Sequence, residues 1–235
     1  MALFALADPH LGYGVRKPMA IFGPQWADHD RRLEENWLAG VRMEDTVLIP
    51  GDISWAMNLD EALPDLRFLN QLPGRKILSR GNHDYWWSSL AKMEQYCRDN
   101  QLDSISFLRN NSVPVSDEWL VCGTRGWLLP GDADFHAADD KIYNREIGRL
   151  RLSLDAAARL RQPGQKLVVC LHYPPSTREF HPTPFTELMD TYTVDHCLYG
   201  HIHGLPPSYA CFNPPGRIRY HLVSADYLGF KPLRL

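Results

Sequence analysis

Seven side chains with donor atoms suited to metal ions occur in five short clusters, and each cluster follows a run of apolar residues. The donors are two carboxylates, four imidazoles and one amide, and no thiolate is among them. They are Asp8, His10, Asp52, Asn82, His172, His201 and His203. Donors of these types in one place predict a metal site.

The apolar runs before these clusters are typical of buried β-strands. They cover residues 3–7, 46–50, 76–79, 167–171 and 197–199. Ligands of open α/β sheets bind outside the carboxyl ends of the strands, so we expect the seven donors to converge at that edge. Asp8 and His10 are two residues apart, as are His201 and His203. In an extended backbone, both members of each pair would point the same way.

The donor types indicate which metal ions would bind. Gly51 and Gly81 stand directly before Asp52 and Asn82, where the backbone must turn sharply off a strand. Carboxylate, imidazole and amide donors suit Mn, Fe, Zn or Ni, and we favour Mn or Fe. A carboxylate shared by two cations would hold them about 3.5–4 Å apart. A water between two such cations becomes hydroxide near neutral pH, so we expect two divalent metal ions and in-line hydrolysis of a phosphoester.

The composition of the chain is that of a globular protein and gives no sign of a membrane-spanning or nucleic-acid-binding one. The chain has 235 residues, of which 44% are hydrophobic and 23% charged, with a formal net charge of -3. These values are typical of a globular protein with one substantial core. The chain has no excess of basic residues that would indicate a nucleic-acid partner. Its apolar runs are too short to cross a bilayer. Residues 1–6 lack a basic region and are interpreted as a first strand instead of a signal peptide.

The cysteines indicate the compartment. Five cysteines occur, and no two are close in sequence. Disulfides and a zinc ribbon are therefore not expected, and a reducing cytoplasm is the predicted location. The sequence leaves the oligomeric state open.

Strand-like runs alternate with helical patterns in the first half of the chain. Helices are expected over 27–41, 60–72 and 88–98, an order that predicts parallel strands with right-handed crossovers. In the second half we expect strands at 107–108, 119–123 and 219–224, a long helix over 139–161 and a short one around 187–189. The arginines of the long helix are interpreted as a solvated face; they are Arg145, Arg149, Arg151, Arg159 and Arg161. The chain has no repeat and no long linker, so residues 1–235 are expected to form a single domain.

The order of the motifs resembles that of the calcineurin-like metallophosphoesterase superfamily. The motifs are Asp8-x-His10, Gly51-Asp52, Gly81-Asn82-His83-Asp84, His172 and Gly200-His201-x-His203. The aromatic runs that follow the second and third motifs are similar to those of a bacterial subgroup of predicted phosphohydrolases. The chain departs from many members after the second motif, where it has Ile53-Ser54-Trp55 instead of a nearby Asp or Asn. The resemblance implies an α/β fold: a two-sheet β-sandwich flanked by helices in four layers, α/β/β/α, with the later strands in the second sheet.

The resemblance also implies roles for the donors. One metal ion would be held by Asp8, His10, Asp52 and His203. The other would be held by Asp52, Asn82, His172 and His201, with Asp52 as the bridge. His83 resembles the family's histidine beside the leaving group, and Asp84 resembles its orienting partner. An imidazole held by a carboxylate can donate a proton or stabilise developing charge.

Two residues outside these motifs are candidate substrate contacts. Arg125 follows a strand and has glycines nearby, which would let it approach a phosphate; a structural salt bridge is the alternative. Trp86 would stack on a base or sugar, with a place in the core as its alternative. The segments after the strand ends are expected to form the walls of an open groove. They are 11–24, the segment at Trp55, 85–87 and 173–184.

We therefore expect a cytoplasmic, metal-dependent phosphohydrolase that acts on a small phosphate mono- or diester, such as a nucleotide, by attack of a metal-bridging hydroxide. A metal-dependent nuclease is the alternative among enzymes, although neither charge nor length indicates nucleic-acid-binding elements. A non-catalytic metal-binding interaction protein is the alternative from another class. Metal-dependent hydrolysis of a phosphoester that Asp52→Ala abolishes would exclude this last alternative.

Overall fold

The strands form two five-stranded sheets in the computed structural model, which describes residues 1–206 and 216–235. The first sheet has the order β10-β1-β2-β3-β4, in which β1 to β4 are parallel and β10 is antiparallel to β1. Its strands are β1 (Leu3–Ala5), β2 (Thr46–Pro50), β3 (Arg75–Ser79), β4 (Ile105–Phe107) and β10 (Leu233–Arg234).

The second sheet has the order β5-β6-β7-β8-β9, in which β6 to β9 are parallel and β5 is antiparallel to β6. Its strands are β5 (Ser112–Pro114), β6 (Trp119–Gly123), β7 (Lys166–Cys170), β8 (His196–Tyr199) and β9 (Arg219–Leu222). They follow β1 to β4 in the chain, and β10 then returns to the first sheet.

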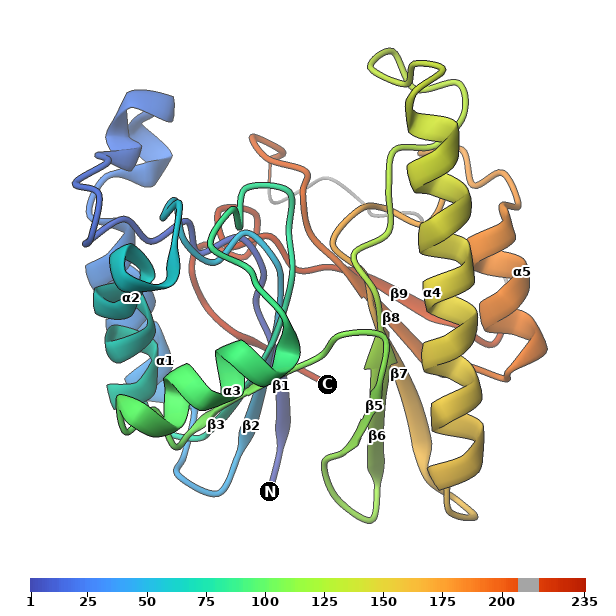
Figure 1. Ribbon diagram of the computed structural model, residues 1–235, viewed down its shortest axis with the longest axis horizontal. Helices are drawn as coiled ribbons and strands as arrows, with labels where there is room; N and C mark the ends of the chain where they lie inside the picture. Colours follow the sequence, from blue (N-terminus) through green and yellow to red (C-terminus); the bar gives the residue numbers. More distant parts are fainter. Residues whose placement is uncertain (207–215) are drawn as a thin grey trace.

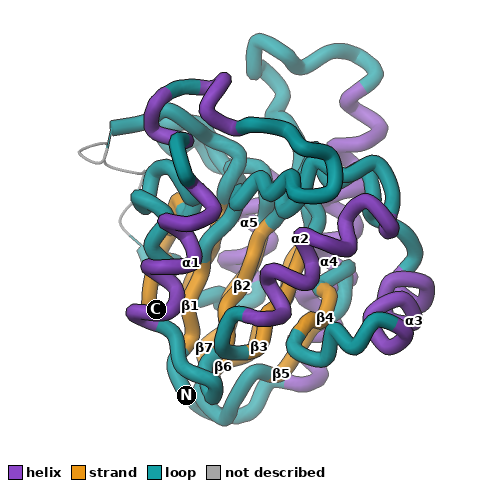
Figure 2. The backbone as a smooth tube through the Cα atoms, turned by 90° about the vertical axis from the view of Figure 1, so that its left-hand side faces the viewer, coloured by secondary structure: helices purple, strands orange, loops and turns teal. Residues whose placement is uncertain are grey.

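Helices cover the outer face of each sheet, so the molecule has four layers (Figure 1). The helices α1 (His29–Gly40), α2 (Leu59–Gln71) and α3 (Leu90–Asp99) lie on the first sheet, as Figure 2 shows face-on. The helices α4 (Asp139–Leu160) and α5 (Pro184–Thr191) lie on the second. Two short 3-10 helices, η1 (Met19–Phe22) and η2 (Pro24–Trp26), belong to the long loop between β1 and α1.

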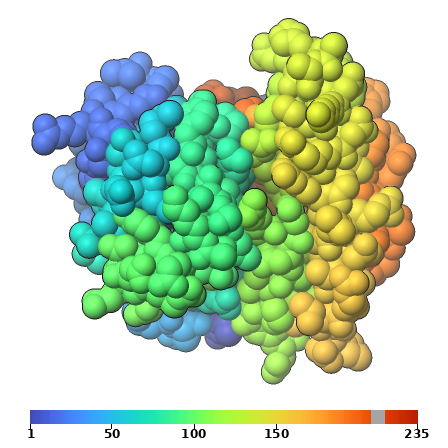
Figure 3. Space-filling view, in the orientation of Figure 1, coloured from blue at the N-terminus to red at the C-terminus, as the bar shows by residue number. Residues whose placement is uncertain are grey.

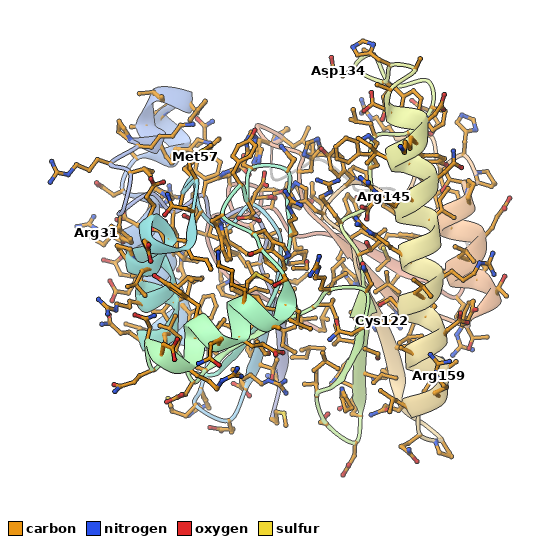
Figure 4. All side chains as sticks on the ribbon, viewed as in Figure 1. Arg31, Met57, Cys122, Asp134, Arg145 and Arg159 are labelled. Carbon is orange, nitrogen blue, oxygen red and sulfur yellow. The ribbon has the colours of Figure 1, made fainter. Side chains whose placement is uncertain are left out.

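Alternating side chains of the central strands enter different cores because both faces of each sheet are covered. In the chain around β1, Phe4 and Leu6 pack under the helices, whereas Leu3 and Ala5 pack between the sheets. In β6, Cys122, labelled in Figure 4, packs on the side of α4. These strands therefore read as continuous apolar runs, without the polar alternation of a half-exposed strand.

The two sheets are joined at the edge where the parallel strands end. Ala7 N donates to Val223 O at 2.7 Å, and Ala225 N donates to Ala7 O at 2.9 Å. These bonds bring the loop after β1 beside the loop after β9. As a result, the donors that follow strands of different sheets face one another across this edge.

Helix α2 also fixes two loops of this edge. Its Asp65 is fully buried and accepts hydrogen bonds from the backbone N–H of Tyr13, at 2.8 Å, and from the hydroxyl of Ser54. The Asn58 side chain caps the helix by accepting from Glu61 N at 3.1 Å. The loop after β1 and the loop after β2 are thereby held against the same helix.

The two-sheet α/β sandwich with flanking helices is confirmed, including a second sheet built from later strands. Two strands escape prediction from the sequence: β5, because residues 113–114 look like an interruption, and β10 at the carboxyl terminus. Cys97, Cys122, Cys170 and Cys197 are buried and free, whereas Cys211 lies outside the described residues. In the described ranges, no helix is long and apolar enough to cross a membrane.

Candidate metal centre

The structure brings the seven predicted donors together at the carboxyl edge of the sheets. The ligand atoms of Asp8, His10 and His203 all lie within 4.8 Å of one another, and so do those of Asp8, Asp52 and His172. In the first group, the Nε2 atoms of His10 and His203 are 3.3 Å apart.

The remaining donors complete a second set of facing atoms. Asn82 Oδ1 lies 2.7 Å from His172 Nε2 and 3.0 Å from His201 Nδ1. His172 Nε2 is also 3.4 Å from Asp52 Oδ2. Four side chains from both sheets thus point at one small volume.

One oxygen of Asp52 faces both the donors around His10 and the donors around His172. Asp52 Oδ2 is 3.8 Å from His10 Nε2 and 3.4 Å from His172 Nε2. Its other oxygen, Oδ1, accepts the backbone N–H of His83 at 2.8 Å. The carboxylate is therefore held by one oxygen and turns the other toward both groups of donors.

The backbone at several donors is left-handed, contrary to the extended geometry expected for residues 8–10. The φ angles are 57° at Asp8, 46° at His10, 51° at Asp52 and 71° at His201. Non-glycine residues rarely adopt this region, and such strain clusters at functional sites. The paired side chains converge because the loops turn off the strands at once.

Two glycines are required by the close approach of these loops. Gly51 has φ 91°, and a Cβ there would lie 2.6 Å from His172 Nδ1. A Cβ on Gly81 would overlap the carboxylate of Asp52. The sharp turn expected at Gly51 is confirmed, whereas Gly81 serves close packing against Asp52.

Outer hydrogen bonds orient two of the histidines. His172 Nδ1 lies 3.0 Å from Pro50 O, which leaves Nε2 to face Asn82. His203 Nδ1 lies 2.9 Å from Asp226 Oδ1. A carboxylate or carbonyl on the far nitrogen fixes the tautomer of a metal-binding histidine and raises its basicity. Asp226 was missed by the sequence reasoning, although it also follows a strand, β9, and the same signal could have found it.

The electrostatics of the centre fit a cation. Burial lowers the pKa of His10 and of His201 to about 3, so both imidazoles present lone pairs at neutral pH. Burial opposes protonation of His172, but the carboxylates of Asp52 and Asp8 outweigh it and raise its pKa to about 9. Asp8 Oδ1 is buried without a hydrogen-bond partner. A divalent cation would give this oxygen a partner and replace the positive charge that the two carboxylates attract.

His83 lines a cavity of about 310 Å³ that opens beside His10 and His203. Its ring lies 4.4 Å from that of Trp55, centroid to centroid, and burial lowers its pKa. Other walls of the cavity are Met19, Phe22, Gln25 and Trp26. On the other side of His201, a second cavity is lined by residues of the 173–178 segment. Parts of the expected walls therefore border the centre, namely Met19, Phe22, Trp55 and residues of 173–178, whereas Tyr85 is exposed and absent from the lining of both cavities.

Asp84 accepts hydrogen bonds from backbone N–H groups and from the Trp86 indole, instead of from the His83 imidazole that it was expected to orient. It is fully buried, and its Oδ2 accepts from Gly81 N at 2.7 Å. Its Oδ1 accepts from Ile53 N, Ser54 N and the indole N–H of Trp86, at 2.9, 3.2 and 3.0 Å. Asp84 therefore ties the turn after Asp52 to the turn before Asn82.

The substrate contact suggested for Trp86 is wrong for this structure. Trp86 is 2% exposed, packs in the core under the helices and directs its only N–H to Asp84. Its large ring is more favourably buried there than held open at the groove. Its N–H is one of the four donors that hold the Asp84 carboxylate in place.

Arg125 lies at the edge of the centre. Its carbonyl accepts the backbone N–H of His172 at 2.8 Å and of Tyr173 at 3.0 Å. Its guanidinium lies 4.2 Å from the ring of Trp127 and 3.8 Å from Glu146 Oε1. The salt bridge considered from the sequence is thus present, while the Nε of Arg125 is buried without a hydrogen-bond partner.

Solved structures with the same arrangement of elements are known at low sequence identity. A phosphopantetheinyl hydrolase from Mycobacterium tuberculosis is 15% identical, with a TM-score of 0.57 over 100% of this chain and 95% of its own. A protein of unknown function from Aquifex aeolicus, AQ665, is 17% identical, with a TM-score of 0.51 over 99% and 95%. TT1561 from Thermus thermophilus is 14% identical, with a TM-score of 0.51 over 84% and 80%. These similarities establish the fold.

Comparison of the sequence alone gives the family. No curated protein matches the chain significantly. The profile of the calcineurin-like phosphoesterases, however, matches residues 1–205, which contain every predicted metal ligand. With the donor geometry above, this match makes the protein a metal-dependent hydrolase, and the chain belongs to the calcineurin-like phosphoesterase family.

Proposed function

We propose that this protein is a binuclear metal-dependent phosphoesterase that hydrolyses a small phosphate mono- or diester. The observation that carries the proposal is the position of Asp52 Oδ2, between His10 Nε2 at 3.8 Å and His172 Nε2 at 3.4 Å. One cation would be held by Asp8, His10, Asp52 and His203, and the other by Asp52, Asn82, His172 and His201. When bound, two divalent cations, with Mn or Fe favoured, would activate water and neutralise the oxygens of the phosphate.

The other residues of the site would bind and position the substrate. The phosphate would lie over the donors, and the leaving group would occupy the cavity of about 310 Å³ lined by Trp26, Trp55 and His83. Lys17, whose Nζ lies 3.1 Å from the ring centre of Trp55, adds a positive charge at this wall. His83 would donate a proton to the leaving group or stabilise its charge. Three aromatic or imidazole rings fit an organic leaving group with an apolar surface.

The experiment is a matrix of metals and substrates. Metal-free protein is reconstituted with Mn²⁺, Fe²⁺, Zn²⁺ or Ni²⁺ and assayed on p-nitrophenyl phosphate and bis(p-nitrophenyl) phosphate, which separate monoesterase from diesterase activity. We expect hydrolysis with at least one metal, abolished by Asp52→Ala. The exposed Asp103→Asn variant, away from the centre, controls for loss of a carboxylate. Absence of hydrolysis under every condition would refute the proposal.

Adding single- and double-stranded nucleic acid to this matrix of substrates tests the alternative of a nuclease. A formal net charge of -3 gives no basic excess to bind a polynucleotide. We therefore expect no metal-dependent cleavage of single- or double-stranded nucleic acid beyond that of Asp52→Ala. Cleavage that weakens steeply as salt rises would favour the nuclease instead.

We also propose that residues 1–235 act as one domain and that the protein works in a reducing cytoplasm. A cluster between the sheets draws on both of them, with Leu48 of the first packed in the same cluster as Val168 of the second. The four buried free cysteines support a reducing compartment. Limited proteolysis that released two separately folded halves would contradict the single domain.

A further inference from the structure

A third cavity, whose lining includes none of the predicted metal ligands, is lined by four arginines and a single carboxylate. Its volume is about 140 Å³, several times the ~30 Å³ share of one water. The charged side chains come from the loops after β3, β4 and β6 and from α4: Arg80, Arg109, Arg125, Arg149 and Glu146. Figure 3 shows a hollow in the surface between the green, middle part of the chain and the yellow helix α4.

The charges of this cavity do not balance within the described residues. Glu146 is fully buried, accepts from Thr124 Oγ1 at 2.6 Å and forms ion pairs with Arg149 and Arg125. Across the ranges 1–206 and 216–235, Arg80 and Arg109 have no carboxylate within ion-pair distance. One carboxylate thus faces four guanidinium groups.

Two of these arginines also have buried donors without a hydrogen-bond partner. The Nε atoms of Arg80 and Arg125 are inaccessible to solvent and unpaired. A buried donor left unpaired is costly, about 1–3 kcal/mol, and more for a charged group. A planar guanidinium matches the oxygens of a phosphate, which can accept two of its N–H groups at once. The excess of guanidinium groups over carboxylates in this cavity therefore fits an anion with several acceptor oxygens.

Two residues of the cavity neighbour predicted metal ligands, one along the chain and one through a backbone hydrogen bond. Arg80 is two residues before Asn82 in the chain. The carbonyl of Arg125 accepts the backbone N–H of His172 at 2.8 Å. This adjacency is the arrangement that a small molecule with two anionic groups would need, one group in the cavity and one over the metal ligands.

We propose that the Arg80/Arg109/Arg125/Arg149 cavity binds a second phosphate group of the substrate, so that the substrate is a small molecule with two phosphates. This inference rests on the proposed function, because the first phosphate is the one hydrolysed. A polynucleotide is a poorer fit, since the cavity is small and the chain has no basic excess. Free inorganic phosphate shares the same chemistry, and the experiment separates it from a substrate phosphate.

The test removes the two arginines that have no carboxylate partner. Arg80→Ala/Arg109→Ala leaves Glu146 paired with Arg149 and Arg125, so no buried anion is stranded. If the double variant does not fold, the single variant Arg109→Ala, at an exposed position, takes its place in both measurements. The matched control is Arg159→Ala, which is exposed at the far end of α4 (Figure 4).

The first measurement is the preference for a second phosphate. The ratio of kcat/KM for bisphosphates to that for monophosphates is determined on Mn²⁺-loaded protein for linear diols from propanediol to hexanediol. We expect wild-type protein and Arg159→Ala to prefer the bisphosphate at one linker length. The double variant should lower this ratio by about 10-fold or more, the factor expected for one lost charge-assisted hydrogen bond. An unchanged ratio would overturn the inference.

The second measurement does not depend on turnover. Inorganic sulfate, which has the shape and oxygens of phosphate, is titrated calorimetrically into the Mn²⁺-loaded proteins. We expect binding to the wild type and to Arg159→Ala that the double variant loses. Equal binding to all three proteins would overturn the anion site, and loss of sulfate binding with an unchanged substrate ratio would assign the cavity to a free anion. If no protein hydrolyses any ester, the proposed function fails, while the titration still decides whether the cavity binds an anion.

Discussion

Replacement of Asp84 by asparagine tests how the metal-binding loops are held. Asp84 Oδ1 accepts three hydrogen bonds, from Ile53 N, Ser54 N and the Trp86 indole, whereas Oδ2 accepts one, from Gly81 N at 2.7 Å. Asparagine keeps three of these bonds by placing its carbonyl oxygen at the Oδ1 position. Its NH₂ group then faces the N–H of Gly81, so the hydrogen bond next to Asn82 is lost. Two donors face each other in its place and repel.

The expected cost follows from this geometry. One buried donor left without an acceptor should lower the free energy of unfolding by about 1–3 kcal/mol. Displacement of the Gly81 turn should also weaken metal binding by about 10–100-fold, the usual effect of losing an outer hydrogen bond in a metal site. The cation predicted at Asn82 should lose more affinity than the cation at His10.

The assays are urea unfolding of the metal-free protein and calorimetric titration with Mn²⁺. Asp103→Asn, exposed and remote from the centre, should match the wild type in both. Asp84→Ala, which strands all four donors, should be much less stable than Asp84→Asn. If Asp84→Asn unfolds within about 0.5 kcal/mol of the wild type and binds metal equally well, the carboxylate does not hold the two loops as described.

His83→Ala should retain metal while kcat falls by about 10²–10⁴, with a smaller loss for nitrophenolate leaving groups; an equal loss for good and poor leaving groups would assign His83 to positioning. Asp226→Asn should weaken only the cation bound by His203, by about 10–100-fold in a chelator competition, and weakening of both sites would contradict this. Burial raises the pKa of Asp65 from 3.8 to about 6, so the folded state binds this proton more tightly than the unfolded state, and Asp65 lowers stability as the pH rises through this range. The free energies of unfolding of Asp65→Asn and wild type should therefore be similar near pH 4, apart from the contribution of the hydrogen bond to Ser54. By pH 7 the variant should have become more stable relative to the wild type by up to about 3 kcal/mol. A difference in unfolding free energy that does not depend on pH would be inconsistent with the shifted pKa.

The position of the candidate site was predictable because buried parallel strands give a strong sequence signal. In β2, for example, all five residues, Thr46–Pro50, are buried, and the run is continuously apolar after its first residue. Its end is therefore visible in the sequence, and Asp52 follows it. The donors of both sheets could be assigned to one edge because parallel strands end on the same side.

Side-chain direction was less predictable, because it depends on contacts distant in sequence. The long helix α4 looked solvated along its arginines, yet Arg149 pairs with Glu146, which is fully buried against Thr124, the residue after β6. An isolated glutamate in a charged helix gives no sign that it faces a cavity. Trp86 likewise follows a metal-ligand motif but turns into the core, where its N–H finds Asp84.

The two missed strands are short and lie at sheet edges. β5 has three residues, including Pro114, and β10 has two. Each pairs antiparallel with one neighbour, Ser112 with Cys122 and Phe4 with Arg234. Such strands carry little periodic signal of their own and form because a neighbouring strand offers an open edge.

The proposed binuclear centre depends on Asp52 as the bridge, and counting metals in three proteins tests this most directly. Wild type, Asp52→Asn and Asp8→Asn would be saturated with Mn²⁺, analysed for metal content and crystallised to locate the ions by anomalous scattering. We predict two ions per chain in the wild type, reduced occupancy at both positions in Asp52→Asn, and reduced occupancy at only one position in Asp8→Asn. A wild-type protein with at most one strong site, or an Asp52→Asn variant that weakens a single position, would contradict the bridge.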